Sequence, residues 1–380
     1  MQRYPFFDDH THPLDPQKTV LTPEGLAMEF LHGYHDLPGG GVSDDLMHHV
    51  RHQGVVYTLV RQLSEFLGCE ATLEAVTQAR NARVGRDGVA VYARDLYADA
   101  GIFASLLDSD LPVGDSRIDL LPGKVLRHVQ MDPIFFEVLK TATSYETMKE
   151  TYLTQIRKAI LEHGFASIKC HIGEHFTMDV RYVSDVEAQM ALAAARGGDH
   201  EAQRTVYYAI FHATMLEAQR LDVPIHIHSG MTGGMWDGKV SDCDPYLIAP
   251  FLRDVPHMMN TKILMLHSNF PYLGGAALLA HTFPHMYIDL AWVLPWNSLN
   301  LAHCLEEVLM IAPVSKILLG SGQHNIPEIA WLSARTADRT LNFVTGKLIA
   351  QEMINEAQAD DISRKLMYEN ACRLYRLPTP

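Results

Sequence analysis

The sequence predicts an α/β fold of the (β/α)8 TIM-barrel class, and three observations lead to this prediction. Short hydrophobic segments recur along the chain, and each ends in polar residues. Two helix-to-strand units follow one another between residues 143 and 228, a pattern typical of parallel α/β folds. A length of 380 residues suits one barrel with insertions. We therefore expect a single barrel domain over residues 1–380, with an irregular, largely helical insertion at about 20–140.

The composition indicates a globular protein that acts on a small molecule. Its formal charge of −14 and pI near 5.8 argue against a general nucleic-acid binder, because phosphate attraction needs a basic face. The five cysteines lack CxxC spacing, which fits reduced thiols of a cytoplasmic protein. The chain has no apolar run long enough to cross a membrane and no signal-peptide pattern at its start. We expect a cytoplasmic homo-oligomer with neither nucleic-acid nor membrane partners.

The first predicted strand begins at Phe6 and stops at Pro13. Side chains alternate along a strand, so His10 and His12 share one face near its carboxyl end. Two imidazoles in this arrangement can chelate one divalent ion, and imidazole suits zinc, iron or nickel. The alternative is a pair of surface histidines in a flexible N-terminus. The aromatic lead-in favours a buried strand.

The region after this strand is less legible. Residues 22–74 are helical in pattern and rich in histidines, which we expect to be lid or surface groups, and Leu37–Val42 breaks the pattern. In residues 84–142, Val89–Tyr92 is a plausible strand. The adjacent Arg127–His128 pair could reach an anionic substrate, but a solvated charged pair is the preferred interpretation.

The first clear helix-to-strand unit starts at Thr143–Glu146, which has capping-box spacing. Apolar residues then recur at every fourth position until Gly164, and the strand that follows has Lys169 and His171 on a single face. A lysine inside an apolar strand is costly unless it is paired or modified. Lys169 is therefore either paired with a carboxylate, neutral, or carbamylated to bridge metal ions.

The second unit is a helix from about Glu201 to Leu221 followed by a strand that ends at His228. His226 and His228 share one face of this strand, opposite two isoleucines. Taken alone, the pair is explained equally well as core histidines bonded to backbone carbonyls or as metal ligands. The glycine-rich loop at 230–234 suits close approach of a ligand.

Three further strands are predicted at Lys262–Asn269, His285–Leu290 and Lys316–Gly322. The first ends near His267, and the second places Asp289 near its end. In a (β/α)8 barrel the carboxyl ends of the strands surround the active site. We therefore expect the strand-end residues to converge there: His10, His12, Lys169, His228, His267 and Asp289.

Several of these segments resemble motifs of a known family. The segments are Asp9–Pro13, Ile225–Gly230, Leu266–Tyr272, Tyr287–Asp289 and Gly320–Glu328. Together they resemble the amidohydrolase superfamily, and the nearest branch is the one whose domains are fused to, or encoded beside, glutamine-synthetase-like proteins. The resemblance is firm at the N-terminus and from Pro224 to about Asn342, and thin between residues 20 and 140.

The resemblance implies a metal-dependent hydrolase. It implies one or two divalent ions, with zinc expected first and manganese, iron or nickel as alternatives. The implied metal ligands are His10, His12, Lys169, His228 and His267, with Lys169 bridging as a carbamate and His226 pointing deeper. The residues implied in catalysis are His267, Asp289, His324 and the position of Gly322.

Gly322 is where the sequence departs from the family pattern. The family has an aspartate at this place, which holds the metal and shuttles the proton of the attacking water. Loss of a general base costs about 10²–10⁴-fold in rate. Three explanations remain: a substitution made to trap a ligand, an enzyme that uses His324, Asp289 or Glu328 instead, or a non-catalytic barrel. The intact remaining ligands favour the first two.

The function expected from these observations is hydrolysis of an amide-type C–N bond by a metal-activated water. By family analogy the substrate is small and polar, with γ-glutamyl amides as the first class to test. One alternative is a metal-dependent decarboxylase of the same superfamily, which would release carbon dioxide instead of an amine. Another is a ligand-binding barrel without turnover.

Overall fold

The computed structural model describes residues 4–31, 43–231 and 238–380 and contains two compact units. Unit 1 comprises residues 1–125, 233–236 and 289–380, and unit 2 comprises residues 126–232 and 237–288. The predicted breaker Leu37–Val42 and most of the predicted 230–234 loop lie outside the described residues. No helix in the described part of the chain is long and apolar enough to cross a membrane.

The strands of unit 1 are parallel and centre on the His-x-His segment. Strand β1 (Phe6–Leu14) lies between β2 (Ile102–Leu107) and β9 (Gln323–Asn325). Its residue Thr11 pairs in register with Leu107 on one side and Gln323 on the other. Strand β1 is buried from its first residue, as its aromatic lead-in predicts. The short strand β8 (Ile317–Leu318) covers only part of the predicted Lys316–Gly322 strand.

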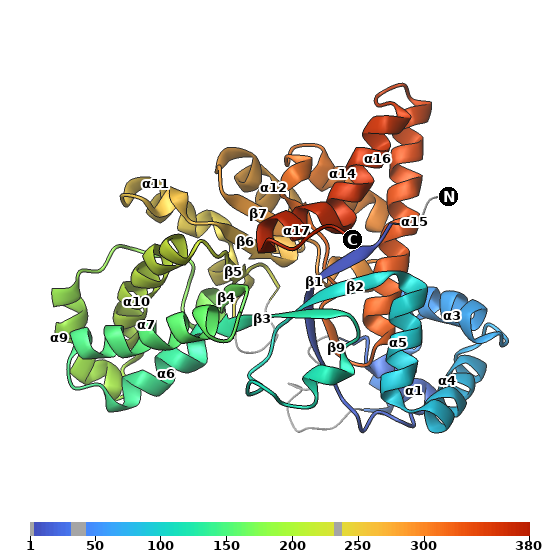
Figure 1. The fold of residues 1–380 in the computed structure, drawn as a ribbon, viewed down its shortest axis with the longest axis horizontal. Coiled ribbons are helices and arrows are strands. Elements are labelled where there is room, and N and C mark those ends of the chain that lie inside the picture. The colour runs from blue at the N-terminus through green and yellow to red at the C-terminus, as the bar shows by residue number, and fades with distance from the viewer. Residues whose placement is uncertain (1–3, 32–42, 232–237) are drawn as a thin grey trace. The chain divides into compact units, whose positions relative to one another are not determined.

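Helices supply the rest of unit 1. The predicted helical insertion at about 20–140 is confirmed for the described residues up to Ala100, which form α1 (Pro23–Met28), α2 (Asp44–Val50), α3 (Gly54–Leu67), α4 (Leu73–Asp87) and α5 (Val89–Ala100). Beyond Ala100 these bounds also contain strands, the first of which is β2. The C-terminal helices are α13 (Val293–Trp296), α14 (Leu301–Leu309), α15 (Glu328–Ala350), α16 (Glu356–Arg364) and α17 (Asn370–Tyr375). The long α15 packs against α16, as the red ribbons of Figure 1 show.

The predicted strand at Val89–Tyr92 is wrong, because this segment forms the first turn of α5. The buried residues of α5 recur with helical spacing, at Val89, Tyr92, Ala93, Leu96 and Tyr97. The apolar residues Val89–Tyr92 alone resemble a strand. The helical spacing of the buried residues over the whole segment shows that it is a helix. Strands β2 and β3 (Lys124–Gln130) were not predicted.

Unit 2 alternates parallel strands with helices. Its strand order is β7-β6-β5-β4-β3, with β4 (Ser167–Cys170), β5 (Ile225–His228), β6 (Ile263–Leu266) and β7 (Met286–Asp289). Its helices are α6 (Met131–Thr141), α7 (Tyr145–Leu161), α8 (Ile172–His175), α9 (Asp185–Arg196), α10 (His200–Leu221), α11 (Ala249–Asp254) and α12 (Leu273–Thr282). Parallel strands that follow chain order confirm the predicted α/β class, with the arrangement used by (β/α)8 barrels.

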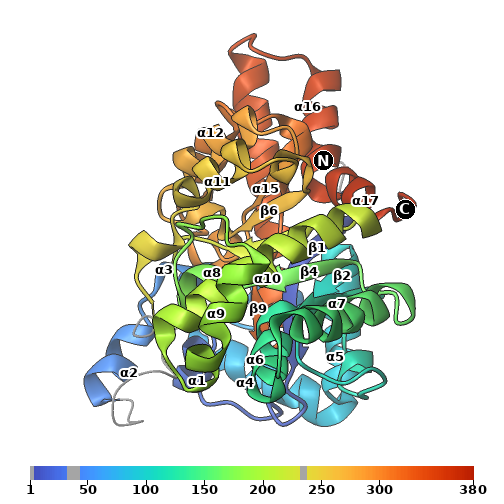
Figure 2. The same ribbon diagram turned by 90° about the vertical axis from the view of Figure 1, so that its left-hand side faces the viewer.

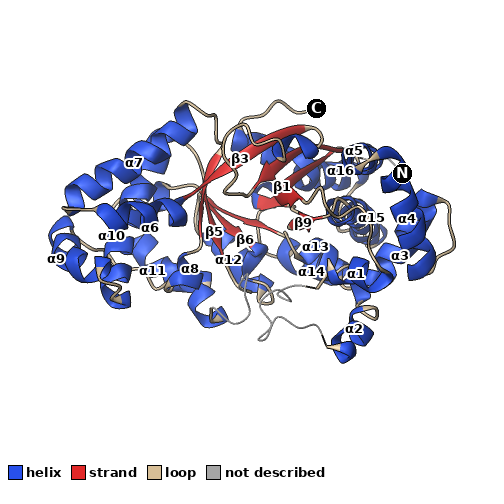
Figure 3. Cartoon of the chain, turned by 90° about the horizontal axis from the view of Figure 1, so that it is seen from below, coloured by secondary structure: helices blue, strands red, loops and turns tan. Residues whose placement is uncertain are grey.

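Both predicted helices of this unit are confirmed. Helix α7 is capped by Ser144, whose side chain accepts from the N–H of Thr147 at 3.2 Å, so Thr143 is not the cap. Helix α10 begins after Asp199, whose carboxylate accepts from the N–H of Ala202 at 2.8 Å. Helices α9 and α10 pack side by side (Figure 2). In Figure 3, α6, α7 and α10 lie to one side of the red strands β5 and β6.

A buried ion pair connects the helical insertion of unit 1 to the segment after β9. Arg80 of α4 donates from Nε to Oε1 of Glu328, the first residue of α15, at 2.9 Å. The side chains are only 1% and 0% exposed. Arg80 also donates to the carbonyl of Thr19 at 3.0 Å. Glu328 was considered above as a general base in place of the missing aspartate. Its carboxylate instead forms a structural ion pair with Arg80.

We predict that Arg80→Met lowers the free energy of unfolding by about 3–5 kcal/mol, because it leaves the Glu328 carboxylate buried without its cation. Urea denaturation followed by circular dichroism measures the change. Arg86→Met on the same helix is the matched control, since Arg86 is exposed and pairs with the adjacent Asp87 at the surface. Its cost should stay below about 1 kcal/mol. Equal effects of the two substitutions would contradict the role given to Arg80.

Candidate metal-binding site

Unit 1 brings His10 and His12 together with Asp108, a residue not predicted as a ligand. Nε2 of His10 lies 3.2 Å from Nε2 of His12, as expected for alternate residues of one strand. Asp108 follows β2 directly, and its N–H donates to the carbonyl of Thr11 at 2.8 Å. One ligand atom from each of the three side chains lies within 4.8 Å of the others. Two imidazoles and a carboxylate are a donor set that binds zinc and related divalent ions.

Two residues of strand β9 contact His12 of this cluster. The ring of His324 stacks on the ring of His12, with centroids 3.9 Å apart and planes 14° apart. Gln323 donates from Nε2 to the carbonyl of His12 at 3.3 Å and accepts from the hydroxyl of Tyr97 at 3.2 Å. The predicted catalytic residue His324 therefore lies directly against a candidate metal ligand, and its side chain is partly exposed.

Gly322 occupies a position that only glycine fits in this structure. Its φ is +62°, which is unfavourable for other residues, and its N–H donates to the carbonyl of His10 at 2.8 Å. A Cβ atom at this position would overlap the indole of Trp292. The space into which an aspartate at position 322 would extend is therefore filled by an aromatic ring.

Buried carboxylates surround the backbone of the His-x-His segment. Asp8 accepts from the N–H and the hydroxyl of Ser321, both at 2.7 Å, but complete burial raises its pKa to about 7. Asp9 accepts from the hydroxyl of Tyr375 at 2.5 Å. Burial, together with repulsion from Asp289, raises the pKa of Asp9 well above its usual value. Asp289 is itself fully buried.

A change of pH should therefore act on stability through Asp8. Because its folded pKa of about 7 exceeds the ordinary value of 3.8, the folded state binds the proton more tightly than the unfolded state. The free energy of unfolding of the metal-free protein should fall as pH rises from about 4 to 7, by a few kcal/mol from this group. Urea denaturation across this range checks the prediction, and Asp8→Asn should flatten the profile. An equally steep decline in Asp8→Asn would contradict it.

Unit 2 contains a second cluster, made by His171, Glu174 and His228. His228 ends β5, and its Nε2 lies 3.4 Å from Oε1 of Glu174 and 2.7 Å from the carbonyl oxygen of Met231. His171 and Glu174 come from the turn and short helix that follow β4. Burial lowers the pKa of His228 to about 4, so the imidazole is neutral at physiological pH and can act as a ligand.

His267 lies beside His228, with ring centroids 4.6 Å apart. It begins a run of three residues with positive φ, namely His267, Ser268 and Asn269 at +65°, +49° and +58°. Such conformations are rarely adopted outside glycine and are held by surrounding contacts. Ser229 provides them here, because its hydroxyl accepts from the N–H of Asn269 at 3.0 Å and donates to the carbonyl of Leu266 at 2.7 Å.

The remaining predicted residues of unit 2 are buried in the sheet. Lys169 is 1% exposed and pairs in register with His226. The ring centroids of His226 and His128 are 4.4 Å apart. His226 is fully buried, as predicted for a supporting residue. His128, interpreted as solvated, is also fully buried and bonds the hydroxyl of Ser167 at 2.7 Å, so that interpretation is wrong. Carbamylation of Lys169 and convergence of all strand ends on one site stay predictions.

Asp132 fixes the orientation of His171. Its Oδ2 accepts from the backbone N–H of His171 at 2.9 Å and from Nδ1 at 3.1 Å, which leaves Nε2 as the metal-binding nitrogen. The hydroxyl of Tyr207 donates to the other oxygen. Burial opposes ionisation of Asp132, but these hydrogen bonds outweigh it and lower its pKa below the usual value.

The cluster residues that sequence reasoning missed had weak local signals. Asp108 ends an apolar run at residues 102–107 in the manner of the other strand ends, but no β2 was predicted there. His171 was placed on one face with Lys169 and was not assigned as a ligand. Asp132 and Glu174 lie in helices, where the sequence pattern gives carboxylates no distinct role.

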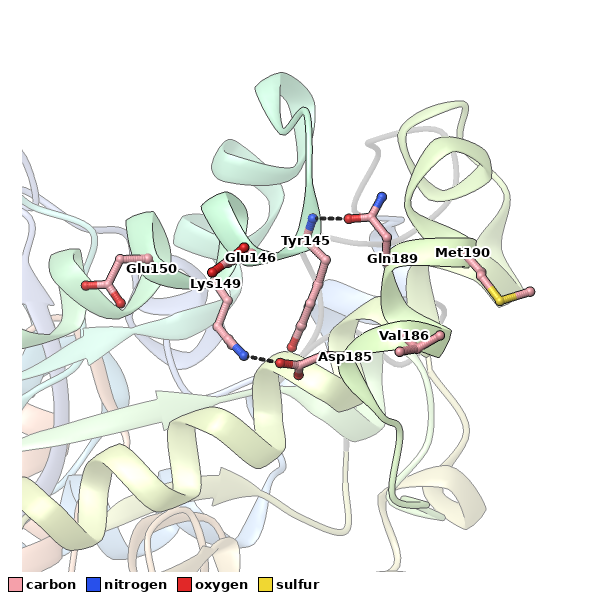
Figure 4. A pocket seen from close by; sticks show the side chains of 8 residues that line it. All are labelled: Tyr145, Glu146, Lys149, Glu150, Asp185, Val186, Gln189 and Met190. Atoms are coloured by element: carbon pink, nitrogen blue, oxygen red, sulfur yellow. Dashed lines mark hydrogen bonds and ion pairs between the residues drawn. The ribbon is translucent and has the colours of Figure 1, made fainter.

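Unit 2 also has a surface hollow of about 560 Å³ (Figure 4). It is lined by residues of the first two turns of α7 and of α9: Tyr145, Glu146, Lys149, Glu150, Asp185, Val186, Gln189 and Met190. Lys149 pairs with Asp185 across it, and the N–H of Tyr145 donates to Gln189 at 2.7 Å. None of the candidate metal ligands lines this hollow.

Comparison of the chain with known protein families identifies its family. The family described as Amidohydrolase matches residues 148–377, more than half of the chain. The protein belongs to the amidohydrolase family. The predicted resemblance is thereby confirmed, and with it the metal-dependent class of this family.

This family member is also similar to known individual proteins. It is 28% identical to protein fluG of Emericella nidulans over 155 residues, which span 40% of this chain and 17% of the length of fluG. Among solved structures, a Lactobacillus casei protein assigned as a metal-dependent hydrolase has a TM-score of 0.82 at 18% identity, over 98% of this chain and 95% of that one. The glucuronate isomerase of Caulobacter crescentus has a TM-score of 0.70 at 15% identity, over 98% and 91% of the chains. These two structural matches establish the shared fold.

We predict that Asp132→Asn weakens metal binding at the His171 cluster by about 10–100-fold, because Nδ1 loses its carboxylate partner. Zinc titration of the metal-free amidohydrolase by calorimetry measures the change. Tyr207→Phe is the matched control, since it removes a hydrogen bond to Asp132 but keeps the contact with His171. A larger loss of zinc affinity in Tyr207→Phe than in Asp132→Asn would contradict the role given to Asp132.

Proposed function

We propose that this amidohydrolase hydrolyses an amide-type C–N bond in a small polar substrate, with γ-glutamyl amides as the first class. The observation that carries the proposal is the cluster of buried His10, partly buried His12 and buried Asp108, a ligand set built at the ends of adjacent strands. A divalent ion bound there would lower the pKa of a water molecule to about 7 and polarise the scissile carbonyl. Zinc is the proposed ion, and manganese, iron and nickel are alternatives.

The cluster of His171, Glu174 and His228 supports binding of a second ion or of a polar substrate group. His267, packed beside His228, is proposed as a further ligand of this unit 2 cluster. The left-handed run that begins at His267 is held at Asn269, whose N–H donates to the hydroxyl of Ser229 at 3.0 Å.

His324 is the proposed general base in place of the missing carboxylate at position 322. Of the three replacements considered, Glu328 is held by Arg80 and Asp289 is fully buried. His324 is partly exposed, and its ring stacks on that of the candidate ligand His12. An imidazole can act as a general base that takes the proton of an attacking water.

We predict that metal analysis finds bound transition metal and that the metal-loaded protein releases amine from γ-glutamyl amides. Removal of the metal with a chelator should abolish release, and addition of zinc should restore it. Bound metal without turnover on any amide would favour the ligand-binding alternative, and carbon dioxide release from carboxylate substrates would favour the decarboxylase. Absence of metal binding would refute the proposal.

His324→Ala should lower kcat for amine release by about 10²–10⁴-fold while the bound metal content stays unchanged. The reason is that the substitution removes the proposed base but no ligand. His163→Ala, which alters an exposed histidine outside both clusters, is the matched control and should keep full activity. Wild-type turnover in His324→Ala would exclude His324 as the base.

A further inference from the structure

The Gly322 position cannot accept a carboxylate without rearrangement of its surroundings. The residue has a φ of +62°, and any side chain there would overlap the indole of Trp292. Trp292 is only 5% exposed and is itself held at a φ of +68°, so the indole is enclosed in the core of unit 1. The Trp292 indole therefore excludes a side chain at position 322.

A carboxylate is nevertheless present beside His10 and His12. The Asp108 side chain belongs to the same compact ligand cluster as the two histidines, in which one ligand atom of each residue lies within 4.8 Å of the others. The backbone of Asp108 is anchored at Thr11, the residue between the two histidines, by a hydrogen bond of 2.8 Å. Asp108 is 2% exposed, so its carboxylate is held away from bulk water.

We infer that Asp108, at the end of β2, supplies the carboxylate ligand of the metal ion held by His10 and His12, in place of a residue at position 322. Two neutral imidazoles and one carboxylate make a three-ligand set that leaves a coordination position for water or substrate. This inference rests on the metal-binding part of the proposed function. It also explains how the other ligands can bind a metal ion although position 322 has no carboxylate.

One consequence concerns the origin of Gly322. If glycine had replaced a native aspartate, reversion should fit the surrounding structure. The overlap with Trp292 and the positive φ argue against this, so we expect Gly322→Asp to destabilise the protein without increasing metal affinity.

Cobalt binding provides a direct test of Asp108 as a ligand. Asp108→Cys places a thiol at the proposed ligand position, and a cobalt-bound thiolate gives a charge-transfer absorption band. The band should appear when Co²⁺ is added to metal-free Asp108→Cys and stay absent in Asp110→Cys, the matched control at an exposed position two residues later. Equal spectra of the two variants would overturn the inference.

Zinc titration of Asp108→Asn gives an independent readout. We expect the affinity of one site to fall by about 10²-fold or more, because a charged ligand is lost, with Asp110→Asn unchanged. Unchanged affinity in folded Asp108→Asn, or an increase in Gly322→Asp, would contradict the inference.

His12→Ala separates failure of this inference from failure of the proposed function. If His12→Ala weakens zinc binding and Asp108→Asn does not, the metal site stands and only the assignment of Asp108 fails. If neither substitution weakens binding, the proposed metal site itself fails.

Discussion

The pairing of β1 with its two neighbours is the constraint on which the candidate site in unit 1 depends. Thr11 pairs in register with Leu107 of β2 and with Gln323 of β9, and its carbonyl accepts from the N–H of Asp108. Parallel pairing thus brings the end of β2 and the start of β9 to the two sides of the His-x-His segment. A slip of one residue in β1 would turn both imidazoles away from their partners, because side chains alternate between faces.

Burial of charge explains how the surrounding residues are arranged. An isolated carboxylate in an apolar interior is strongly unfavourable, so each buried acid needs donors. Ser321 donates to Asp8, Tyr375 donates to Asp9, and Arg80 pairs with Glu328. In unit 2, Tyr207 and His171 donate to Asp132. These contacts fix the backbone and the ligand side chains before a metal ion binds, which reduces the reorganisation that binding requires.

The sequence was sufficient to predict features that depend on the spacing of residues along one strand or helix. Alternation placed His10 beside His12, and helical spacing predicted α7 and α10. It was insufficient where a contact joins residues that are distant in the chain. The carboxylate of Asp108 meets His10 only through the β1–β2 register, and Glu328 meets Arg80 across 248 residues. The absence of a carboxylate at Gly322 was visible in the sequence, whereas the indole that fills its place was not.

The most direct test of the metal site is a crystal structure of the zinc-loaded protein with anomalous data collected at the zinc edge. An anomalous peak bound by His10, His12 and Asp108, with Trp292 still packed against Gly322, is the predicted result. A zinc ion bound without Asp108, or no peak at these histidines, would contradict the assignment of this cluster as the metal centre.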